Sequence, residues 1–419
     1  STILAQVSEV GLRPVPRWRT PKPFAPTPFT SSTAMARGRV ALLLVAKLAL
    51  TAAFQMGDST FDHTWQSKAD MPENRSDLTA TTVGDAIYLI GGCEGNQEWS
   101  AEAGMYLCSA ASKATVRYAP ATNTYVRLED APVTRYRHAA AAAGTKIYLF
   151  GGVDVQDNVR PQVDVFDTVA GTWSSAGAMP NATTDLMAVA VSMNGEARIF
   201  VMGGYYPPSY VASDMMMIYS PANSTWTAGP SLVQARGDAS AAVAGGKVYV
   251  LGGFYTDDWN QPLSSVEMLD PALMNGGWTA KRPMIVARAD MAVASLHDVL
   301  HVMGGETKNG DGQEAPLTDV GAYDAAQDRW YPGGNIHSHR FRFVAAAHGN
   351  SIYIFGGQGY LSGTYGTPGS EYPVYKMVEQ YEETVVSNNA IEASSARGDR
   401  CGAAALLGSL LSVLLPRAA

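Results

Sequence analysis

The sequence predicts an all-β protein built from six copies of one unit. Six short apolar runs, such as "IYLIGG" and "VYVLGG", end in a Gly-Gly pair. The first glycines are Gly91, Gly151, Gly203, Gly252, Gly304 and Gly356. Intervals of 60, 52, 49, 52 and 52 residues separate them, so the repeat has a period near fifty. Alternating Ala-rich runs and turn pairs such as "NG" precede each pair, a pattern typical of a two-stranded hairpin.

An aromatic residue precedes each Gly-Gly pair at a fixed distance. Trp65, Tyr125, Trp226, Trp278 and Trp330 lie 26 residues before their glycine, and Trp173 lies 30 before. Another large residue comes before most of these aromatics, in the series Tyr118, Phe166, Tyr219, Leu269, Tyr323 and Tyr381. The region from Phe61 to Val386 resembles the kelch repeat family in its double glycines, its paired aromatic residues and the period of its repeat. The resemblance implies a six-bladed kelch β-propeller, in which each blade has four strands, a to d.

The ring is expected to close by joining the two ends of the repeat region. Asn388, not Trp, stands seven places after Tyr381, so the last unit lacks strand d. The segment "FDHTWQSKADMP" around Trp65 is a strand d without a preceding a, b or c. We therefore predict that the Trp65 strand pairs with the Tyr381 strand and removes an open sheet edge.

The segments flanking the predicted propeller, residues 54–388, look like targeting signals. Residues 35–53 combine basic residues with a short apolar core, as a signal peptide does. Residues 1–34 are either upstream sequence or a transit-like leader, and the second reading would direct the protein to an organelle lumen of the thylakoid type. Residues 389–419 contain a polar spacer and an apolar tail, which fits a GPI-attachment signal or a short tail without function. We expect a protein of the secretory pathway, at the cell surface or outside the cell.

Composition limits the partners. The 30 Lys and Arg residues against 38 Asp and Glu residues leave no basic field for nucleic acid. Membrane contact is expected only through a lipid anchor, and we expect a monomer without cofactor or metal. Cys93 and Cys108 lie in one loop after the first Gly-Gly pair, where a disulfide would suit an exported protein; two free thiols are the alternative. Glycosylation sequons occur at Asn74, Asn181 and Asn223.

Charged residues recur at the start of each strand a. Sixteen residues before the first glycine stand Arg75, Arg135, Arg236, Arg288 and Arg340, and the third blade has Thr183. Two residues later come Asp77, Arg137, Asp185, Asp238, Asp290 and Arg342. Residues two positions apart lie on the same side of a straight strand. We therefore expect both sets of residues, together with His339, to surround the upper mouth of the channel. Such a ring either neutralises itself through Arg–Asp pairs or binds an anionic or hydroxyl-rich ligand.

Aromatic residues crowd the loops between strands b and c. The first of these loops contains Trp99 and Tyr106. In the later loops, the candidates for ligand contact are Tyr205, Tyr206, Tyr255, Trp259, Tyr360 and Tyr365. Exposed aromatic rings provide contact area for proteins and stack on sugars, although loops also use them to pack on themselves.

The expected function is an exported, cell-surface propeller that binds a protein or a glycan through its upper-face loops. The alternative comes from resemblance alone: some six-bladed kelch proteins are sialic-acid mutarotases, and a ring of Arg and Asp with His339 would supply acid–base groups. No catalytic residue can be assigned from the sequence.

Overall fold

A computed structural model of the chain describes residues 64–95, 97–100, 105–255, 261–308, 314–360 and 372–383. The predicted leader, signal peptide, spacer and tail lie outside these residues. Trp259 and Tyr365 lie outside them as well, and nothing is described of the side chains of Trp99 and Tyr106.

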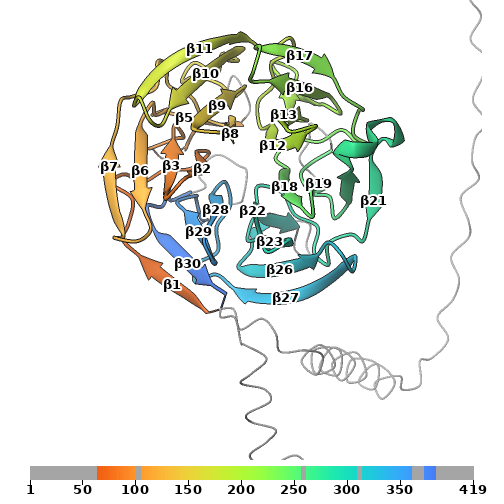
Figure 1. Cartoon of the computed structure of the whole chain (residues 1–419). Coiled ribbons are helices and arrows are strands. Elements are labelled where there is room, and N and C mark those ends of the chain that lie inside the picture. Colours follow the sequence, from red (N-terminus) through yellow and green to blue (C-terminus); the bar gives the residue numbers. More distant parts are fainter. Residues whose placement is uncertain are drawn as a thin grey trace, which may run out of the picture. The chain divides into compact units, whose positions relative to one another are not determined.

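Six four-stranded antiparallel sheets form the blades of a ring, which confirms the predicted propeller (Figure 1). Blade 1 contains β2 (Thr79–Val83), β3 (Ala86–Ile90), β6 (Thr115–Ala119) and β7 (Thr124–Arg127). Blade 2 contains β8 (Ala139–Ala143), β9 (Lys146–Phe150), β10 (Gln162–Asp167) and β11 (Thr172–Ala178). Blade 3 contains β12 (Met187–Met193), β13 (Glu196–Met202), β16 (Met216–Ser220) and β17 (Thr225–Ala228).

The second half of the ring repeats the same strand order. Blade 4 contains β18 (Ser240–Ala244), β19 (Lys247–Leu251), β20 (Val266–Leu269) and β21 (Thr279–Lys281). Blade 5 contains β22 (Ala292–Leu296), β23 (Val299–Met303), β26 (Asp319–Asp324) and β27 (Arg329–Asn335). Blade 6 contains β28 (Val344–His348), β29 (Ser351–Phe355), β30 (Val378–Glu382) and β1 (Trp65–Lys68).

Strand β1 closes the ring as predicted. It pairs antiparallel with β30, with Trp65 opposite Tyr381 and Lys68 opposite Val378 (Figure 1). The rings of Trp65 and Tyr381 lie 5.8 Å apart, and both side chains are buried. The first and the last described strands therefore complete one blade.

The repeated aromatic residues join strands within a blade and blades to one another. In blade 5 the rings of Tyr323 and Trp330, on strands c and d, lie 5.0 Å apart. The indole Nε1 of Trp330 donates a hydrogen bond to the backbone oxygen of Arg282 in the preceding connection, at 3.0 Å. Trp278 and Trp173 make the same kind of bond to Pro230 and Glu129. This explains why an aromatic recurs at a fixed distance from the glycines.

The glycine pairs mark the closest approach between neighbouring blades. Gly252 and Gly253 have φ values of 59° and 87°, which favour glycine. A Cβ atom on Gly252 would lie 2.3 Å from the backbone oxygen of Arg288, and the Gly253 N–H donates to that same oxygen at 3.0 Å. A side chain at this position would separate the two blades.

Loops on one face carry additional structure. We call this the upper face; it contains the b-to-c and d-to-a connections of every blade. Three small hairpins lie in b-to-c connections: β4–β5 (Gln97–Ser100 and Met105–Cys108), β14–β15 (Tyr205–Tyr206 and Val211–Ala212) and β24–β25 (Glu306–Lys308 and Glu314–Pro316). A 3-10 helix, η1 (Pro271–Gly276), lies on the opposite, lower face of blade 4. No helix in the described part of the chain is long and apolar enough to cross a membrane.

Candidate functional site

The structure separates the predicted charged ring into two sets with different roles. The first set, Arg75, Arg135, Arg236, Arg288 and Arg340, is buried, with at most 3% of each residue exposed. The Arg236 guanidinium donates to the Gly252 backbone oxygen at 2.8 Å and to Glu267 Oε1 at 2.5 Å. These five arginines therefore lie inside the blades and not at the channel mouth, so the prediction that they line a ligand site is not supported.

The bonds of this set repeat from blade to blade. Arg135, Arg288 and Arg340 donate to the backbone oxygens of Gly151, Gly304 and Gly356, at 3.0, 2.9 and 3.2 Å. In the third blade the Thr183 hydroxyl takes this place and donates to Gly203 at 3.1 Å. Arg75 differs, because its guanidinium lies 2.8 Å from Glu73 and 3.7 Å from Glu94.

The carboxylates that neutralise these arginines were missed in the sequence. They are Asp164, Glu267, Asp319 and Glu379, paired with Arg135, Arg236, Arg288 and Arg340. Asp164, Glu267 and Glu379 stand two residues before the large residue of strand c, a signal that the sequence does contain. Burial lowers the pKa of Arg135 to about 10, although Asp164 acts in the opposite direction.

The second set forms the channel mouth: Asp77, Arg137, Asp185, Asp238, Asp290 and Arg342. All six residues have φ values between 51° and 54°, in the left-handed region. Each backbone N–H donates to the backbone oxygen of the same position in the preceding blade, at 2.9 to 3.2 Å, and the Asp77 N–H bonds to Arg342 to complete the circle. Because this left-handed residue interrupts the strand, the arginine two positions earlier points elsewhere, and the expected placement on one side is wrong.

We call the side chains of this second set the mouth ring. They line a cavity of about 130 Å³ together with residues that include His138 and Phe343. Arg342 Nε lies 3.2 Å from Asp290 and 3.9 Å from Asp77, and Arg137 Nε lies 3.8 Å from Asp185. The four carboxylates exceed the two guanidiniums, and no ion pair of the described residues includes Asp238.

Burial and mutual repulsion shift the acids of the mouth ring. Burial, reinforced by Asp290 and Asp185, raises the pKa of Asp238 well above its usual range. Burial also raises the pKa of Asp185 to about 6, even though Arg137 opposes the shift. Burial lowers the pKa of His138 to about 3, so this imidazole is neutral at physiological pH.

The predicted loop aromatics have different environments. Tyr205 is buried and packs its ring directly above Gly237, where a Cβ atom would lie 2.2 Å from it, so it is a packing residue and not an exposed one. Tyr206 and Tyr360 are partly buried, whereas Tyr255 is 51% exposed. His339 Nε2 lies 3.4 Å from the backbone oxygen of Tyr360. It is not among the residues that line the cavity.

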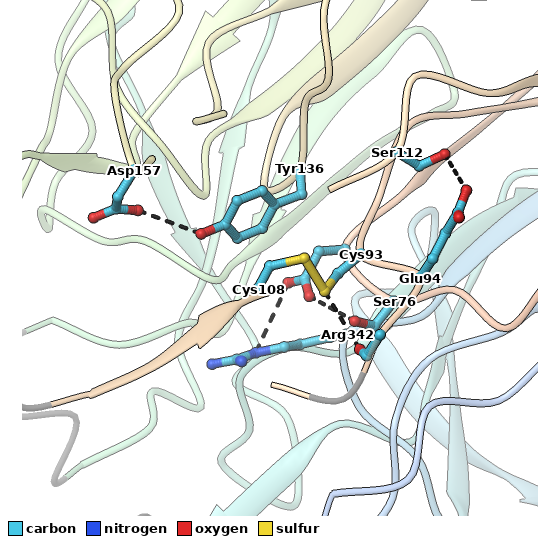
Figure 2. Close-up of a disulfide and its surroundings, with 10 residues drawn as sticks. Ser76, Cys93, Glu94, Cys108, Ser112, Tyr136, Asp157 and Arg342 are labelled. Carbon is cyan, nitrogen blue, oxygen red and sulfur yellow. Dashed lines mark hydrogen bonds and ion pairs between the residues drawn. A yellow bond between two sulfur atoms is a disulfide. The ribbon is translucent and has the colours of Figure 1, made fainter. Parts of the chain in front are cut away.

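A disulfide joins Cys93 and Cys108 beside the mouth ring, as the sequence predicted (Figure 2). Both cysteines are buried in a cluster with Tyr136 and Val153 of blade 2. In Figure 2 the Tyr136 hydroxyl points to Asp157, at 3.4 Å, and the Ser112 hydroxyl to Glu94, at 2.5 Å. The disulfide therefore fixes the first upper-face loop against the neighbouring blade.

The remaining predicted sites are on the surface. The side chains at the three sequons, Asn74, Asn181 and Asn223, are exposed. Within the described ranges, no three His, Cys, Asp or Glu side chains gather in a way that could hold a metal ion.

Comparison with known proteins identifies the family. The sequence profile described as "Attractin/LZTR1 beta-propeller" matches residues 102–363, which is more than half of the chain. The chain belongs to this family of kelch-repeat β-propellers. The chain is 25% identical to Kelch-like protein 34 of Homo sapiens over 276 residues, and the match covers 64% of this chain and 40% of that protein. Beta-scruin of Limulus polyphemus is 32% identical over 222 residues, covering 50% of this chain and 23% of that protein.

The similarity of this kelch propeller to its curated relatives is thus partial. The chain covers about two fifths of the length of the Kelch-like proteins that it matches. A solved structure entitled "Structure of YjhT" superposes with a TM-score of 0.56 at 17% identity, and covers 74% of this chain and 96% of that one. At this identity the superposition shows the shared fold alone.

Proposed function

We propose that this kelch propeller is an exported binding protein that holds a protein partner on its upper face. The observation that carries the proposal is the position of the exposed apolar side chains. Of the eight large hydrophobic residues that are exposed in the described chain, five lie in upper-face connections. These are Val155, Val211, Val233, Tyr255 and Ile285.

The five residues spread over connections of blades 2 to 5. Val155, Val211 and Tyr255 lie in b-to-c connections, whereas Val233 and Ile285 lie in d-to-a connections. Their shared position on the loops of one face makes this face the better candidate for an interaction surface. Four of the five are aliphatic and only Tyr255 offers a flat ring, which favours a protein over a glycan. The kelch propeller fold supports the same role.

Export to the cell surface is part of the proposal. The Cys93–Cys108 disulfide supports it, because such bonds persist in oxidising compartments. The last described residue, Glu383, donates its N–H to Asn350 in the β28–β29 turn, at 3.0 Å. This turn belongs to the lower face, so a lipid attached to the following segment would leave the upper face directed outward. Release of the protein from intact cells by a phosphatidylinositol-specific lipase would support this anchor, and an organelle location would contradict it.

A pair of matched double variants tests the binding face. Val211→Asp with Ile285→Asp places charge on the upper face, whereas Val169→Asp with Leu273→Asp does so on the lower face, at residues that are also exposed. The full chain is applied to protein and glycan arrays. We expect the upper-face variant to lose its protein ligands at least tenfold and the lower-face variant to retain them. Equal loss in both variants, or binding to glycans alone, would contradict the proposal.

No described feature favours the mutarotase alternative. Five of the seven arginines of the predicted ring are buried in their blades, so that only Arg137 and Arg342 line the mouth cavity, and His339 is not among its lining residues. We therefore do not propose this activity.

A further inference from the structure

We propose that the mouth ring binds a small zwitterion, with the ligand's carboxylate on Arg137 and its ammonium group on the arc formed by Asp185, Asp238 and Asp290. This small-molecule site goes beyond the docking of a protein on the surrounding loops. It rests on an unused guanidinium, an excess of carboxylates and the size of the cavity.

The Arg137 side chain is buried, and its Nε has no hydrogen-bond acceptor among the described residues. Only 6% of the residue is exposed, and it lines the mouth cavity. Its nearest charged partner is Asp185 at 3.8 Å, beyond hydrogen-bond distance, and its Cζ lies 5.5 Å from the centre of the Tyr136 ring. The side chain donates no hydrogen bond to any other described residue.

The hydrogen bonds of the buried Arg236 show which contacts the Arg137 side chain lacks. The Arg236 guanidinium donates to Gly252, Ser265 and Glu267, all within its own blade. Leaving buried donors without acceptors is costly, and a planar guanidinium matches the two oxygens of a carboxylate. Arg137 therefore offers its donors to an acceptor that comes from outside the protein.

The opposite side of the mouth lacks a cation. Asp185 and Asp290 each lie near one guanidinium, of Arg137 and of Arg342. Asp238 stands between them in ring order and forms no ion pair with a described cation, although Arg342 and Arg137 act on it at longer range. An ammonium group at this arc would supply the missing positive charge and would favour the ionised form of Asp238. The neutral His138 on the cavity wall would not repel it.

Other ionisable side chains near the arc do not alter this balance. Besides the six members of the mouth ring, the described groups that interact electrostatically with it include Tyr136, Tyr205, Tyr210 and Glu306. The tyrosines are neutral, because burial raises the pKa of Tyr205 and of Tyr210. Glu306 adds negative charge beside Arg342, which favours a cationic group further.

The cavity limits the ligand to a few atoms. Its volume of about 130 Å³ is similar to the roughly 150 Å³ of an engineered cavity that holds benzene. A ligand of about six non-hydrogen atoms fits this space, which is the size of a short amino acid. A neutral polyol of the same size would satisfy Arg137 but would leave the excess negative charge uncompensated.

Calorimetric titration of the purified full chain at neutral pH tests the site with defined probes. Glycine, β-alanine and γ-aminobutyric acid carry both charges at increasing separation; methylamine and acetate carry one each, and erythritol carries none. We expect at least one of the three zwitterions to bind ten times more tightly than either single-charge probe or erythritol. The proposal is overturned if no zwitterion binds, or if a single-charge probe or erythritol binds equally well.

Variants locate the two ends of the ligand. Arg137→Gln and Asp238→Asn should each weaken binding at least tenfold, whereas Asp85→Asn, on an exposed lower turn, should leave binding unchanged. Asn tolerates the left-handed conformation of position 238, and the Arg137 side chain donates no hydrogen bond to a described residue, so both variants should fold. If both variants fold and bind as the unchanged chain does, the assignment is wrong. The ligand series on the unchanged chain decides the question even if a variant fails to fold.

Discussion

At the scale of single residues, a left-handed conformation in each blade decides what the channel mouth presents. Asp and Asn tolerate this conformation better than most residues, whereas long side chains rarely adopt it. Arg137 and Arg342 nevertheless occupy it, because their backbone N–H and C=O groups belong to the closed circle of hydrogen bonds. The side chains of these positions are thereby directed to the cavity while the backbone joins the blades.

The ionisation of Asp238 should make the folded protein less stable as the pH rises. Its pKa is higher in the folded state than the ordinary value of 3.8, so the folded state holds the proton longer. The free energy of unfolding should therefore fall as the pH rises from about 4 toward the folded pKa. Asp238→Asn removes this ionisation and should flatten the decline, whereas the exposed Asp85→Asn should not. Urea denaturation at several pH values measures the effect, and identical slopes for Asp238→Asn and the unchanged chain would contradict it.

The buried pair of Arg236 and Glu267 should be essential to blade 4. Arg236→Met leaves Glu267 buried without its partner and should cost about 3 to 5 kcal/mol of stability. Arg198→Met breaks a more accessible pair with Glu196 and should cost less than about 1 kcal/mol. Combining Arg236→Met with Glu267→Gln should cost less than the sum of the two single changes. Urea denaturation of the four variants gives these values, and a loss below 1 kcal/mol for Arg236→Met would show that the pair is not stabilising.

At the scale of elements, the blades share one four-stranded plan but differ in their upper connections. The hairpin β4–β5 ends at Cys108, whose disulfide to Cys93 lies against Tyr136 of blade 2. The hairpin β14–β15 instead contains the buried Tyr205, which packs on Gly237 of the next d-to-a connection. Both contacts, the disulfide beside Tyr136 and the packing of Tyr205 on Gly237, fix a loop against the following blade and shape the rim around the mouth ring.

Removing the disulfide should loosen the first connection without dismantling the ring. The two cysteines are 15 residues apart, so Cys93→Ser with Cys108→Ser should cost about 3 kcal/mol in the chain-entropy account. We expect faster hydrogen exchange in β4–β5 and unchanged exchange in β22 and β23 of blade 5. Mass spectrometry of exchanged peptides distinguishes these regions. A uniform change over all blades would contradict a local role, and free thiols in the native protein would show that the bond does not form.

At the scale of the whole molecule, each of the six described blades has its full set of four strands. Strand β1 supplies the outer strand of blade 6 and pairs with β30 along its length. The mouth ring adds a second closure, because its circle of backbone hydrogen bonds passes through all six blades. The ring is therefore closed by the completed blade 6 and by the backbone hydrogen bonds around its channel.

Deletion of β1 should leave strand β30 without its outer neighbour. A chain without residues 1–68 loses the Trp65–Tyr381 pair and exposes β30, so it should aggregate. A chain without residues 1–60 keeps β1 and provides the matched control. Size-exclusion chromatography and thermal denaturation compare the two. A monomeric protein of unchanged melting temperature after the longer deletion would show that β1 does not stabilise the ring.

The sequence by itself determined the number of blades and the pairing that closes the ring. These features depend on short-range periodic signals, because the Gly-Gly pairs and the aromatics stand at fixed distances within each unit. The missing Trp after Tyr381 and the unpaired strand at Trp65 were sufficient to predict the closure.

Only the tertiary structure decided which charged residues face the channel. Arg236 and Asp238 are two residues apart, but the left-handed backbone at Asp238 turns one into the blade and the other into the cavity. The partner of Arg236 is Glu267, on another strand, and Asp238 bonds through its backbone to Asp185 in the preceding blade. Local spacing fixes the period of the strands. The direction of a side chain, in contrast, depends on hydrogen bonds and burial between segments that are far apart in the sequence.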